Sequence, residues 1–247
     1  MRLAFALGAL ALGTSLTVTV LPRPAFPAPA AAPNGAHRLV LTSSRPTGVD
    51  TGATVAGSDD VFRGLGLQNE FHTANRIFAV YGKDGSTGRY LIAYTKAGKT
   101  LYAFDFASYA WPPRFKPGER EFVYEQPVWA QEVGGTLYVE NAHSTYASSS
   151  YGRNAYVTAI DLATKRALWR SPALVANANT FLVTKHYLVT GYGFTDEPDY
   201  LYLLDRATGK VVDRLLLPNA AETITWQGTA IRVRTYDHVV VVRLRGT

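Results

Sequence analysis

The stretch YVTAIDLATKRALWR, residues 156–170, is repeated 44 residues later (Asp161 to Asp205) as YLYLLDRATGKVVDR, residues 200–214. Both copies have the pattern of a strand rich in β-branched and aromatic residues, a turn of the D-x-A-T type, and a second strand. A weaker copy, YLIAYTKAGKTLYAF, covers residues 90–104. A unit that recurs at such a spacing indicates a repeat architecture.

The turn in these copies has a simple physical basis. An aspartate at the end of a strand can accept hydrogen bonds from backbone N–H groups two or three residues further on, so Asp161 and Asp205 should each close an Asx-type turn. Gly209, and Gly98 in the weaker copy, can supply the positive φ that leads into the next strand. Lys165 stands where Gly209 stands in the other copy, so its turn must differ or carry strain.

Another strand pair precedes each hairpin. The pairs are 127–133 with 136–140, 180–184 with 187–190, and 223–226 with 230–233. Each unit thus holds four antiparallel strands in about 40 to 50 residues, the size of one β-propeller blade. Long stretches of helical periodicity are missing from the rest of the chain. The sequence therefore predicts an all-β chain, a small β-propeller of four to five four-stranded blades.

The expected number of blades comes from dividing the length after the predicted signal peptide by about 45 residues per blade. Residues 33–247 should form one propeller-like domain, with residues 37–75 supplying strands that complete the final blade beside 239–243. An open β-solenoid, a β-sandwich, or a partial ring completed by a partner chain remain as alternatives.

The repeat resembles that of the quinoprotein-like (PQQ-like) β-propeller family, whose consensus runs L-Y-V, then A-x-D-x-x-T-G-K-x-x-W. The likeness is clear over about residues 127–214 and loose over 72–247. It rests on Leu137-Tyr138-Val139, Ala159-Ile160-Asp161, Thr164 and Trp169, and on Asp205, Thr208, Gly209 and Lys210 in the next unit. Asp213 replaces the tryptophan that the family uses to dock neighbouring blades, so this docking should not be uniform.

The resemblance suggests pyrroloquinoline quinone as a cofactor, but the quinone dehydrogenases are larger and commonly carry adjacent cysteines near it. This chain has no cysteine, which also excludes disulfides, thiolate zinc sites and a cysteine nucleophile. The five histidines show no metal-ligand spacing such as H-x-x-x-H. We therefore expect neither a cofactor nor a metal.

The first residues have the parts of a secretory signal. Met1 and Arg2 precede an uncharged apolar stretch, 3–20, and a Pro/Ala run with A-x-A sites at 28–30 and 30–32. We predict a signal peptide over 1–32 and a secreted or periplasmic protein with no membrane span after its removal; a membrane anchor is the alternative. Losing Arg2 and Arg23 lowers the net charge from +6 to +4. So small a dispersed excess is not typical of nucleic-acid binding.

Candidate binding residues lie in the long loops that join the second and third strands of each unit, 82–88, 141–154 and 191–199. In a propeller these loops share one face, where binding groups commonly sit. The loops offer aromatic and polar side chains: His143, Tyr146, Tyr151, Arg153, Tyr192, Phe194, Asp196 and Glu197. The alternative is that the loops are solvated connections that tolerate insertion.

Two functions fit these patterns. The first is a secreted, non-catalytic propeller that binds an unknown protein, peptide or glycan through its long-loop face. The second is an extracellular carbohydrate-active hydrolase or lyase with two carboxylates at the propeller channel. Its candidate residues are Glu70, Glu140, Asp196 and Glu197. No P-loop, G-x-S-x-G or dinucleotide-binding motif is present.

Overall fold

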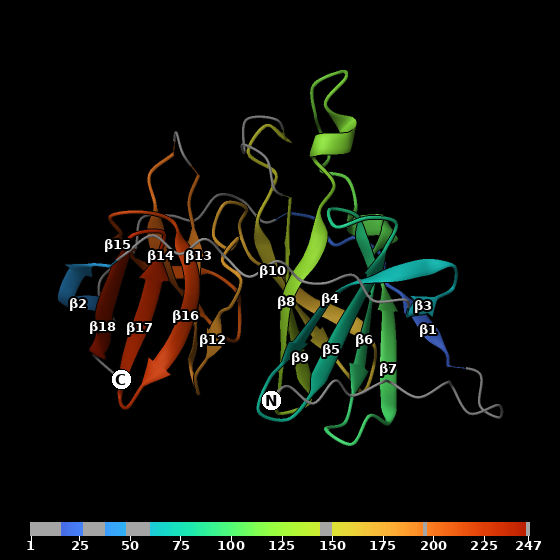
Figure 1. Ribbon diagram of the computed structural model, residues 1–247, viewed down its shortest axis with the longest axis horizontal. Helices are drawn as coiled ribbons and strands as arrows, with labels where there is room; N and C mark the ends of the chain where they lie inside the picture. Colours follow the sequence, from blue (N-terminus) through green and yellow to red (C-terminus); the bar gives the residue numbers. More distant parts are fainter. Residues whose placement is uncertain (1–15, 27–37, 48–59, 144–149, 195–196, 246–247) are drawn as a thin grey trace.

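The computed structural model describes residues 16–26, 38–47, 60–143, 150–194 and 197–245, and these residues form four β-sheets (Figure 1). The first, sheet 1, contains β4 (Leu65–His72), β5 (Ile77–Gly82), β6 (Gly88–Tyr94) and β7 (Thr100–Asp105), with β3 (Val61–Phe62) and β1 (Val18–Val20) at its edges. Sheet 2 contains β8 (Gln126–Val133), β9 (Thr136–Ala142), β10 (Tyr156–Asp161) and β11 (Arg166–Arg170).

Sheet 3 consists of β12 (Leu182–Val183), β13 (Tyr187–Tyr192), β14 (Tyr200–Asp205) and β15 (Val211–Leu216). Sheet 4 consists of β16 (Ala221–Gln227), β17 (Ala230–Thr235), β18 (His238–Arg245) and β2 (Arg38–Pro46). Two 3₁₀ turns, η1 (Ala107–Tyr109) and η2 (Arg120–Phe122), connect sheets 1 and 2. The predicted all-β class is confirmed.

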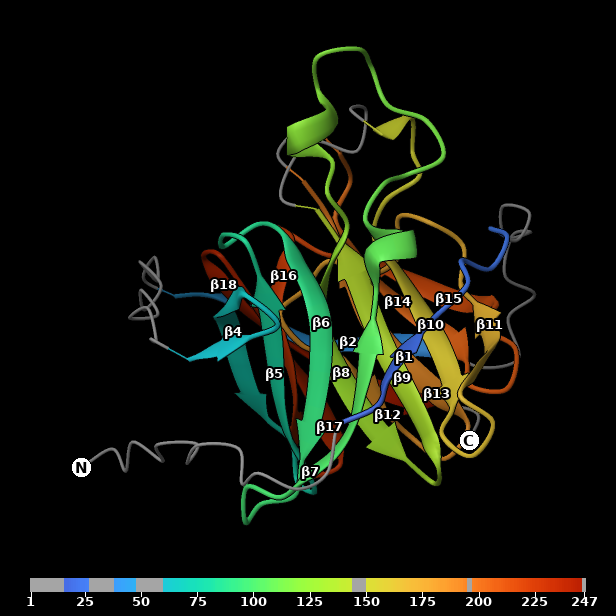
Figure 2. The same ribbon diagram turned by 90° about the vertical axis from the view of Figure 1, so that its right-hand side faces the viewer.

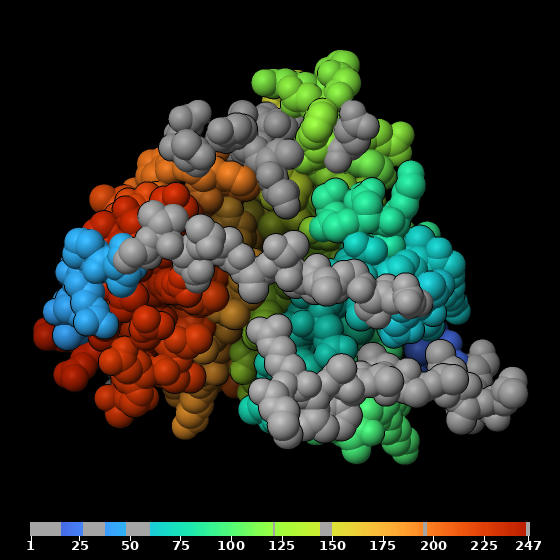
Figure 3. Space-filling view, viewed as in Figure 1, coloured from blue at the N-terminus to red at the C-terminus, as the bar shows by residue number. Residues whose placement is uncertain are grey.

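The sheets follow one another in chain order, and Figure 1 shows β4, β8, β12 and β16 turned toward the middle of the molecule. Apolar layers fill the junctions between sheets 1 and 2, 2 and 3, and 3 and 4. This arrangement of several sheets fits a β-propeller-like fold. In the space-filling view sheets 3 and 4 lie on the left, in orange and red, and sheet 1 lies on the right in green and teal (Figure 3).

The predicted turns have the expected geometry. An Asp161 carboxylate oxygen accepts hydrogen bonds from the Thr164 amide (2.6 Å) and hydroxyl (2.8 Å), and Asp205 does the same with Thr208 at 2.9 and 2.7 Å. Gly209 has φ +70° and Lys165 has φ +60°, so the two turns share one backbone shape. Lys165 holds a left-handed conformation that costs a residue with a Cβ about 1 to 2 kcal/mol. Of the two possibilities for this turn, strain is the one observed.

Trp169 joins sheet 2 to sheet 3 through the turn of the next unit. Its indole nitrogen donates to the backbone oxygen of Arg206 at 3.2 Å. Its ring lies against Gly209, where a Cβ would overlap the indole. A glycine is therefore favoured at this position for two reasons: φ is positive, and the tryptophan ring leaves no room for a Cβ.

Asp213 occupies the corresponding place in sheet 3 and acts differently. One of its carboxylate oxygens accepts a hydrogen bond from the backbone N–H of Leu39 at 2.6 Å, which ties β15 to β2. The strand β2 pairs antiparallel with β18 from Arg38 to Pro46 and completes sheet 4. The predicted return beside 239–243 is thus observed for Arg38–Pro46, whereas β3 and β4 of the same 37–75 region belong to sheet 1.

Two details differ from the expected strands. Residues 180–184 form a strand over Leu182–Val183 alone, because Thr180 turns toward sheet 4. Its hydroxyl donates to the Ile224 oxygen at 3.0 Å and accepts from the Ile224 amide at 2.6 Å. In addition, β1 lies within the predicted signal peptide and pairs in parallel with β7. In the described part of the chain, no helix has the length and apolarity that crossing a membrane would require.

Candidate functional site: the axial cavity

A cavity of about 750 Å³ lies where the inner strands of sheets 1, 2 and 3 converge. We call it the axial cavity. The first strand of sheet 1 contributes Gln68, Asn69 and Phe71 to its wall. The remaining lining residues are Val80 and Gly85 from sheet 1, Gln126, Pro127, Val128, Trp129, Ala142 and His143 from sheet 2, and Asn177, Asn179, Thr180 and Phe194 from sheet 3.

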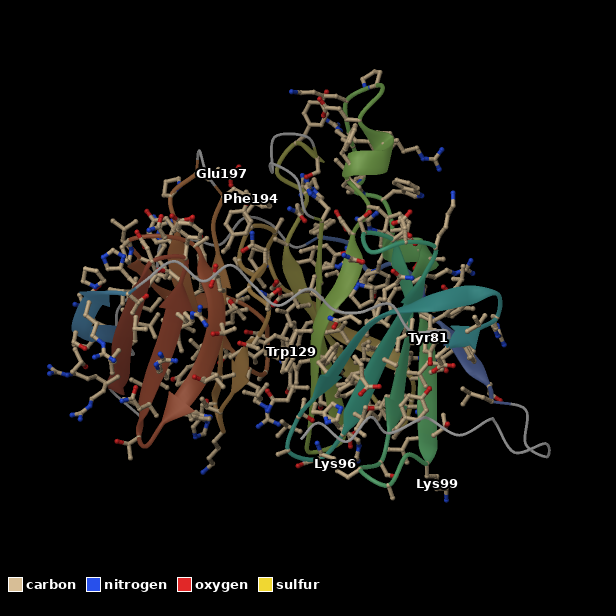
Figure 4. The ribbon with its side chains drawn as sticks, in the orientation of Figure 1. Tyr81, Lys96, Lys99, Trp129, Phe194 and Glu197 are labelled. Atoms are coloured by element: carbon tan, nitrogen blue, oxygen red, sulfur yellow. The ribbon has the colours of Figure 1, made fainter. Side chains whose placement is uncertain are left out.

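The apolar part of the wall is aromatic. Trp129 stacks on Phe71 with the ring centroids 4.5 Å apart and the planes 26° from parallel. Figure 4 shows Trp129 in the middle of the molecule, between its two halves, with Phe194 near the upper rim. The Trp129 indole nitrogen is buried and, within the described residues, has no hydrogen-bond partner. A buried indole N–H usually finds an acceptor, so this donor is open to an acceptor brought by a ligand.

The polar part of the wall consists of side-chain amides, and some of them are already engaged. Asn177 donates to the Gly193 oxygen at 2.9 Å and accepts from its amide at 3.2 Å, which holds the loop that carries Phe194. Gln126 accepts from the Gly88 amide at 2.9 Å and fixes the loop between β5 and β6. Asn177 and Gln126 therefore position loops at the rim of the cavity.

Asn69 and Asn179 differ from these two residues. Their side chains make no hydrogen bond with the described part of the chain. An amide offers two N–H donors and a carbonyl acceptor, so the pair presents both kinds of group to a ligand. Among the described residues that line the cavity there is no carboxylate, lysine or arginine. The site can therefore bind a neutral molecule that exchanges hydrogen bonds and covers aromatic surface.

The predicted binding residues divide among several places. His143 and Phe194 line the axial cavity, whereas Tyr146 and Asp196 lie outside the described residues. His143 is 4% exposed, and its ring bonds to the Ser150 hydroxyl at 3.0 Å. Its Nε2 is therefore occupied within the protein rather than offered to a ligand.

The other four predicted residues do not line the cavity. Tyr192 is buried, packs edge-on against Phe194 at 5.8 Å and donates to Glu197. Its burial and this hydrogen bond raise the pKa of Tyr192. Tyr151 is exposed, and Arg153 lies over the ring of Phe26 at 5.7 Å, at the outer rim. Tyr192 and Glu197 thus support Phe194 from behind.

The carboxylates considered for catalysis lie elsewhere too. Glu140 was expected at the channel but is fully buried, on the same face of sheet 2 as its cross-strand neighbour Val157, in the apolar layer toward sheet 3. Both its oxygens lack partners among the described residues, and burial raises its pKa well above the usual range. Glu70 bonds to His72 at 2.8 Å. The expectation for Glu140 fails because its strand position alternates toward the sheet junction.

Sequence reasoning missed the residues that do line the cavity on the inner strands. A signal was available, because side-chain amides recur on or just before the inner strands: Gln68 and Asn69 lie within β4, Gln126 begins β8, and Asn177 and Asn179 precede β12. Amides recurring at this position indicate a shared polar surface at the axis. The prediction from loop length placed the binding residues at the rim instead.

No family model matches the sequence, and no curated protein matches it. Solved structures match at low identity. The computationally designed Ika4 protein is 11% identical to this chain, with a TM-score of 0.43. The match covers 73% of this chain and 92% of Ika4. The designed Ika8 protein is 10% identical with a TM-score of 0.44 over 72% of this chain, which spans 45% of Ika8.

Two natural proteins are similar to the same degree. BamB from Moraxella catarrhalis is 12% identical with a TM-score of 0.38, covering 77% of this chain and 62% of BamB. The dihydro-heme d1 dehydrogenase NirN, solved in complex with DHE, is 12% identical with a TM-score of 0.45, covering 71% of this chain and 34% of NirN.

Proposed function

We propose that this protein is an exported, non-catalytic β-propeller of four blades that binds a neutral glycan in its axial cavity. The observation that carries the proposal is the lining itself, whose described residues combine aromatic faces with unengaged side-chain amides and include no carboxylate or ammonium group. Sugars present hydroxyl groups that both donate and accept, and apolar ring faces that cover aromatic side chains.

The rival function, a hydrolase or lyase, needs two carboxylates facing a bound sugar. The part of the lining that the structure describes has none, and Glu140 is enclosed between sheets 2 and 3. A neutral acid without access to substrate cannot act on it. The structure therefore favours binding over catalysis at this site.

Export is the second part of the proposal. It rests on the basic start, apolar stretch and A-x-A sites of residues 1–32. The mass of the protein collected from outside the cell, compared with that of the intact chain, tests it directly. A chain that keeps residues 1–32 and stays inside the cell would contradict export.

The binding function is tested by titration calorimetry with neutral oligosaccharides and, in parallel, with uncharged peptides. We expect saturable binding of an oligosaccharide that Asn69→Ala and Asn179→Ala each weaken by about tenfold, the equivalent of one good hydrogen bond to a desolvated partner. Asn75→Ala, in an exposed turn away from the cavity, is the matched control and should bind like the wild type.

Three results would contradict the glycan assignment. The first is equal weakening by Asn75→Ala. The second is binding of the uncharged peptides, weakened by Asn69→Ala, but of no sugar. The third is cleavage of the bound oligosaccharide, which would support the hydrolase instead.

A further inference from the structure

The segment from Leu16 to Phe26 lies along the outer rim, across the junction of sheets 1 and 2 (Figure 2, blue). Its strand β1 extends sheet 1 in parallel, with Val18 opposite Ala103 and Val20 opposite Asp105. Leu21 follows and is fully buried, and its carbonyl accepts a hydrogen bond from the Ser108 hydroxyl. The segment is therefore packed and hydrogen-bonded against the protein rather than lying loosely on its surface.

The next residues of the segment enter a polar and aromatic recess. Arg23 donates to the Trp111 carbonyl oxygen and forms an ion pair with Glu125 at 3.4 Å. The ring of Phe26 meets that of Tyr156 edge-on at 5.0 Å, and the guanidinium of Arg170 lies 4.5 Å above the Phe26 ring. An arginine and a phenylalanine three residues apart thus fill adjoining positions.

We call the recess under this segment the rim groove. The name stands for a set of residues that are buried while the segment is in place: Tyr109, Glu125, Tyr156, Thr158 and Arg170, together with the edge of β7. Tyr109 and Tyr156 also flank the guanidinium of Arg170, at 4.7 and 4.5 Å.

The two ionisable residues Glu125 and Arg170 of the rim groove are buried, and their polar atoms are only partly hydrogen-bonded. Arg170 is 4% exposed, and within the described residues none of its three side-chain nitrogens makes a well-aligned hydrogen bond, although its guanidinium interacts with the Tyr109 hydroxyl. Glu125 is fully buried, one of its oxygens lacks a partner, and burial raises its pKa to about 8. Buried charged groups without full hydrogen bonding cost stability, so a fold that keeps them uses them for something else, and ligand binding is a common use.

We propose that the rim groove is a peptide-binding site, occupied by residues 16–26 in the unprocessed chain and opened when the predicted signal peptide is removed. This inference rests on the export part of the proposed function and not on the glycan site. The ligand it fits is an extended peptide that adds a parallel strand to β7. It carries a cationic residue for Glu125 and, three residues later, an aromatic residue for Arg170.

Removal of residues 1–32 leaves this site in a state suited to such a ligand. The edge of β7 loses its parallel neighbour, and an unpaired strand edge is a template for another extended chain. Arg170 loses the Phe26 ring, Glu125 loses the Arg23 guanidinium, and both become accessible at the rim.

The experiment compares the form of the protein collected from outside the cell, in which we expect residues 1–32 to be missing, with the chain of residues 1–247. Intact-mass measurement first fixes the N-terminus of each form. A fluorescently labelled peptide of residues 16–26 is then titrated with both, and its anisotropy is followed. We expect the processed chain to bind the peptide saturably and the intact chain not to bind it.

Variants of the peptide test the two anchor positions. Arg23→Ala and Phe26→Ala peptides should each bind about tenfold more weakly, as expected for the loss of one charge-assisted contact or one buried ring. An Ala25→Ser peptide is the control, since Ala25 is exposed in the intact chain, and it should bind like the parent. In the protein, at a pH above the Glu125 pKa of about 8, Glu125→Gln should weaken binding of the parent peptide but have little effect on the Arg23→Ala peptide.

Several outcomes would overturn the proposal. An exported chain that still carries residues 16–26, equal binding by the intact and processed forms, or no binding by the processed form would each do so. Titration of the same samples with the oligosaccharide shows whether the peptide site and the glycan site in the axial cavity are independent. Asn69→Ala should leave peptide binding unchanged, and the peptide should not displace a bound oligosaccharide.

Discussion

The carboxylate of Asp213 and the backbone N–H of Leu39, 174 residues apart, form a 2.6 Å hydrogen bond between sheet 3 and the strand that completes sheet 4. The equivalent position in sheet 2 holds Trp169, which docks on the following unit through its ring. A charged acceptor here satisfies an edge-strand N–H that an indole ring could not. The departure from the repeat consensus is thus explained by the return of the N-terminal strand.

Replacing Asp213 should therefore loosen β2. We expect Asp213→Ala to lower the free energy of unfolding by about 1 to 3 kcal/mol, because the Leu39 N–H is left without its acceptor. Hydrogen exchange of that amide should accelerate more than exchange in sheet 2. Asp213→Asn keeps a side-chain carbonyl and should cost less. Equal urea midpoints for wild type and Asp213→Ala would contradict this account.

Gly209 and Gly98 form a natural matched pair. Both have positive φ, +70° and +81°, but a Cβ at Gly98 meets nothing within 4 Å while one at Gly209 would overlap Trp169. Gly98→Ala should cost about 1 to 2 kcal/mol for the left-handed backbone. Gly209→Ala should cost a further 1 to 3 kcal/mol or so for overpacking. Similar losses in chemical denaturation of the two variants would show that the tryptophan gives way freely.

Glu140 should leave a signature in the pH dependence of stability. Its pKa is raised well above the usual range by burial, so the folded protein keeps a proton that the unfolded chain releases. Its contribution is fully present below the unfolded pKa, near 4.3, and is lost as the pH rises toward the folded pKa, by about 1.4 kcal/mol per pH unit.

The Glu140→Gln variant does not titrate at this position, so its stability should fall less steeply with rising pH than that of the wild type. Urea unfolding at a series of values between about pH 5 and pH 8 measures the two slopes. A residual slope from Glu125, whose pKa burial raises to about 8, should remain. Glu222→Gln on β16 is the control. A wild-type slope in Glu140→Gln would contradict the assignment of a neutral buried acid.

Arg76 and Glu132 connect sheets 1 and 2 at the end of the strands away from the long loops. The guanidinium makes two contacts of 2.7 Å with the carboxylate, which also accepts a hydrogen bond from Tyr102 at 2.8 Å. A lysine cannot reproduce the paired geometry, so Arg76→Lys should cost about 1 kcal/mol, reduced by the partial exposure of both side chains. Arg166→Lys, at an exposed position, should be neutral. A double-mutant cycle with Glu132→Gln checks the coupling.

The local parts of the fold could be predicted because each depends on a few neighbouring residues. The Asp161 and Asp205 turns, the paired strands around them and the strain at Lys165 follow from hydrogen bonding and backbone sterics within a short segment. The site was harder to predict. Loop residues such as His143 and Phe194 did reach the cavity, but Asn69, Trp129 and Asn179 come from separate sheets and meet only after packing.

The amino-acid sequence alone determined the strand-turn-strand units, their repetition and the all-β class, since periodicity and turn chemistry are encoded over a few residues. Tertiary structure decided the rest. It placed Glu140 inside a sheet junction, gave Asp213 a partner at Leu39, and seated Arg23 and Phe26 on Glu125 and Arg170. These contacts join residues far apart in the chain, and their energies depend on burial and distance, which exist only once the sheets have packed together.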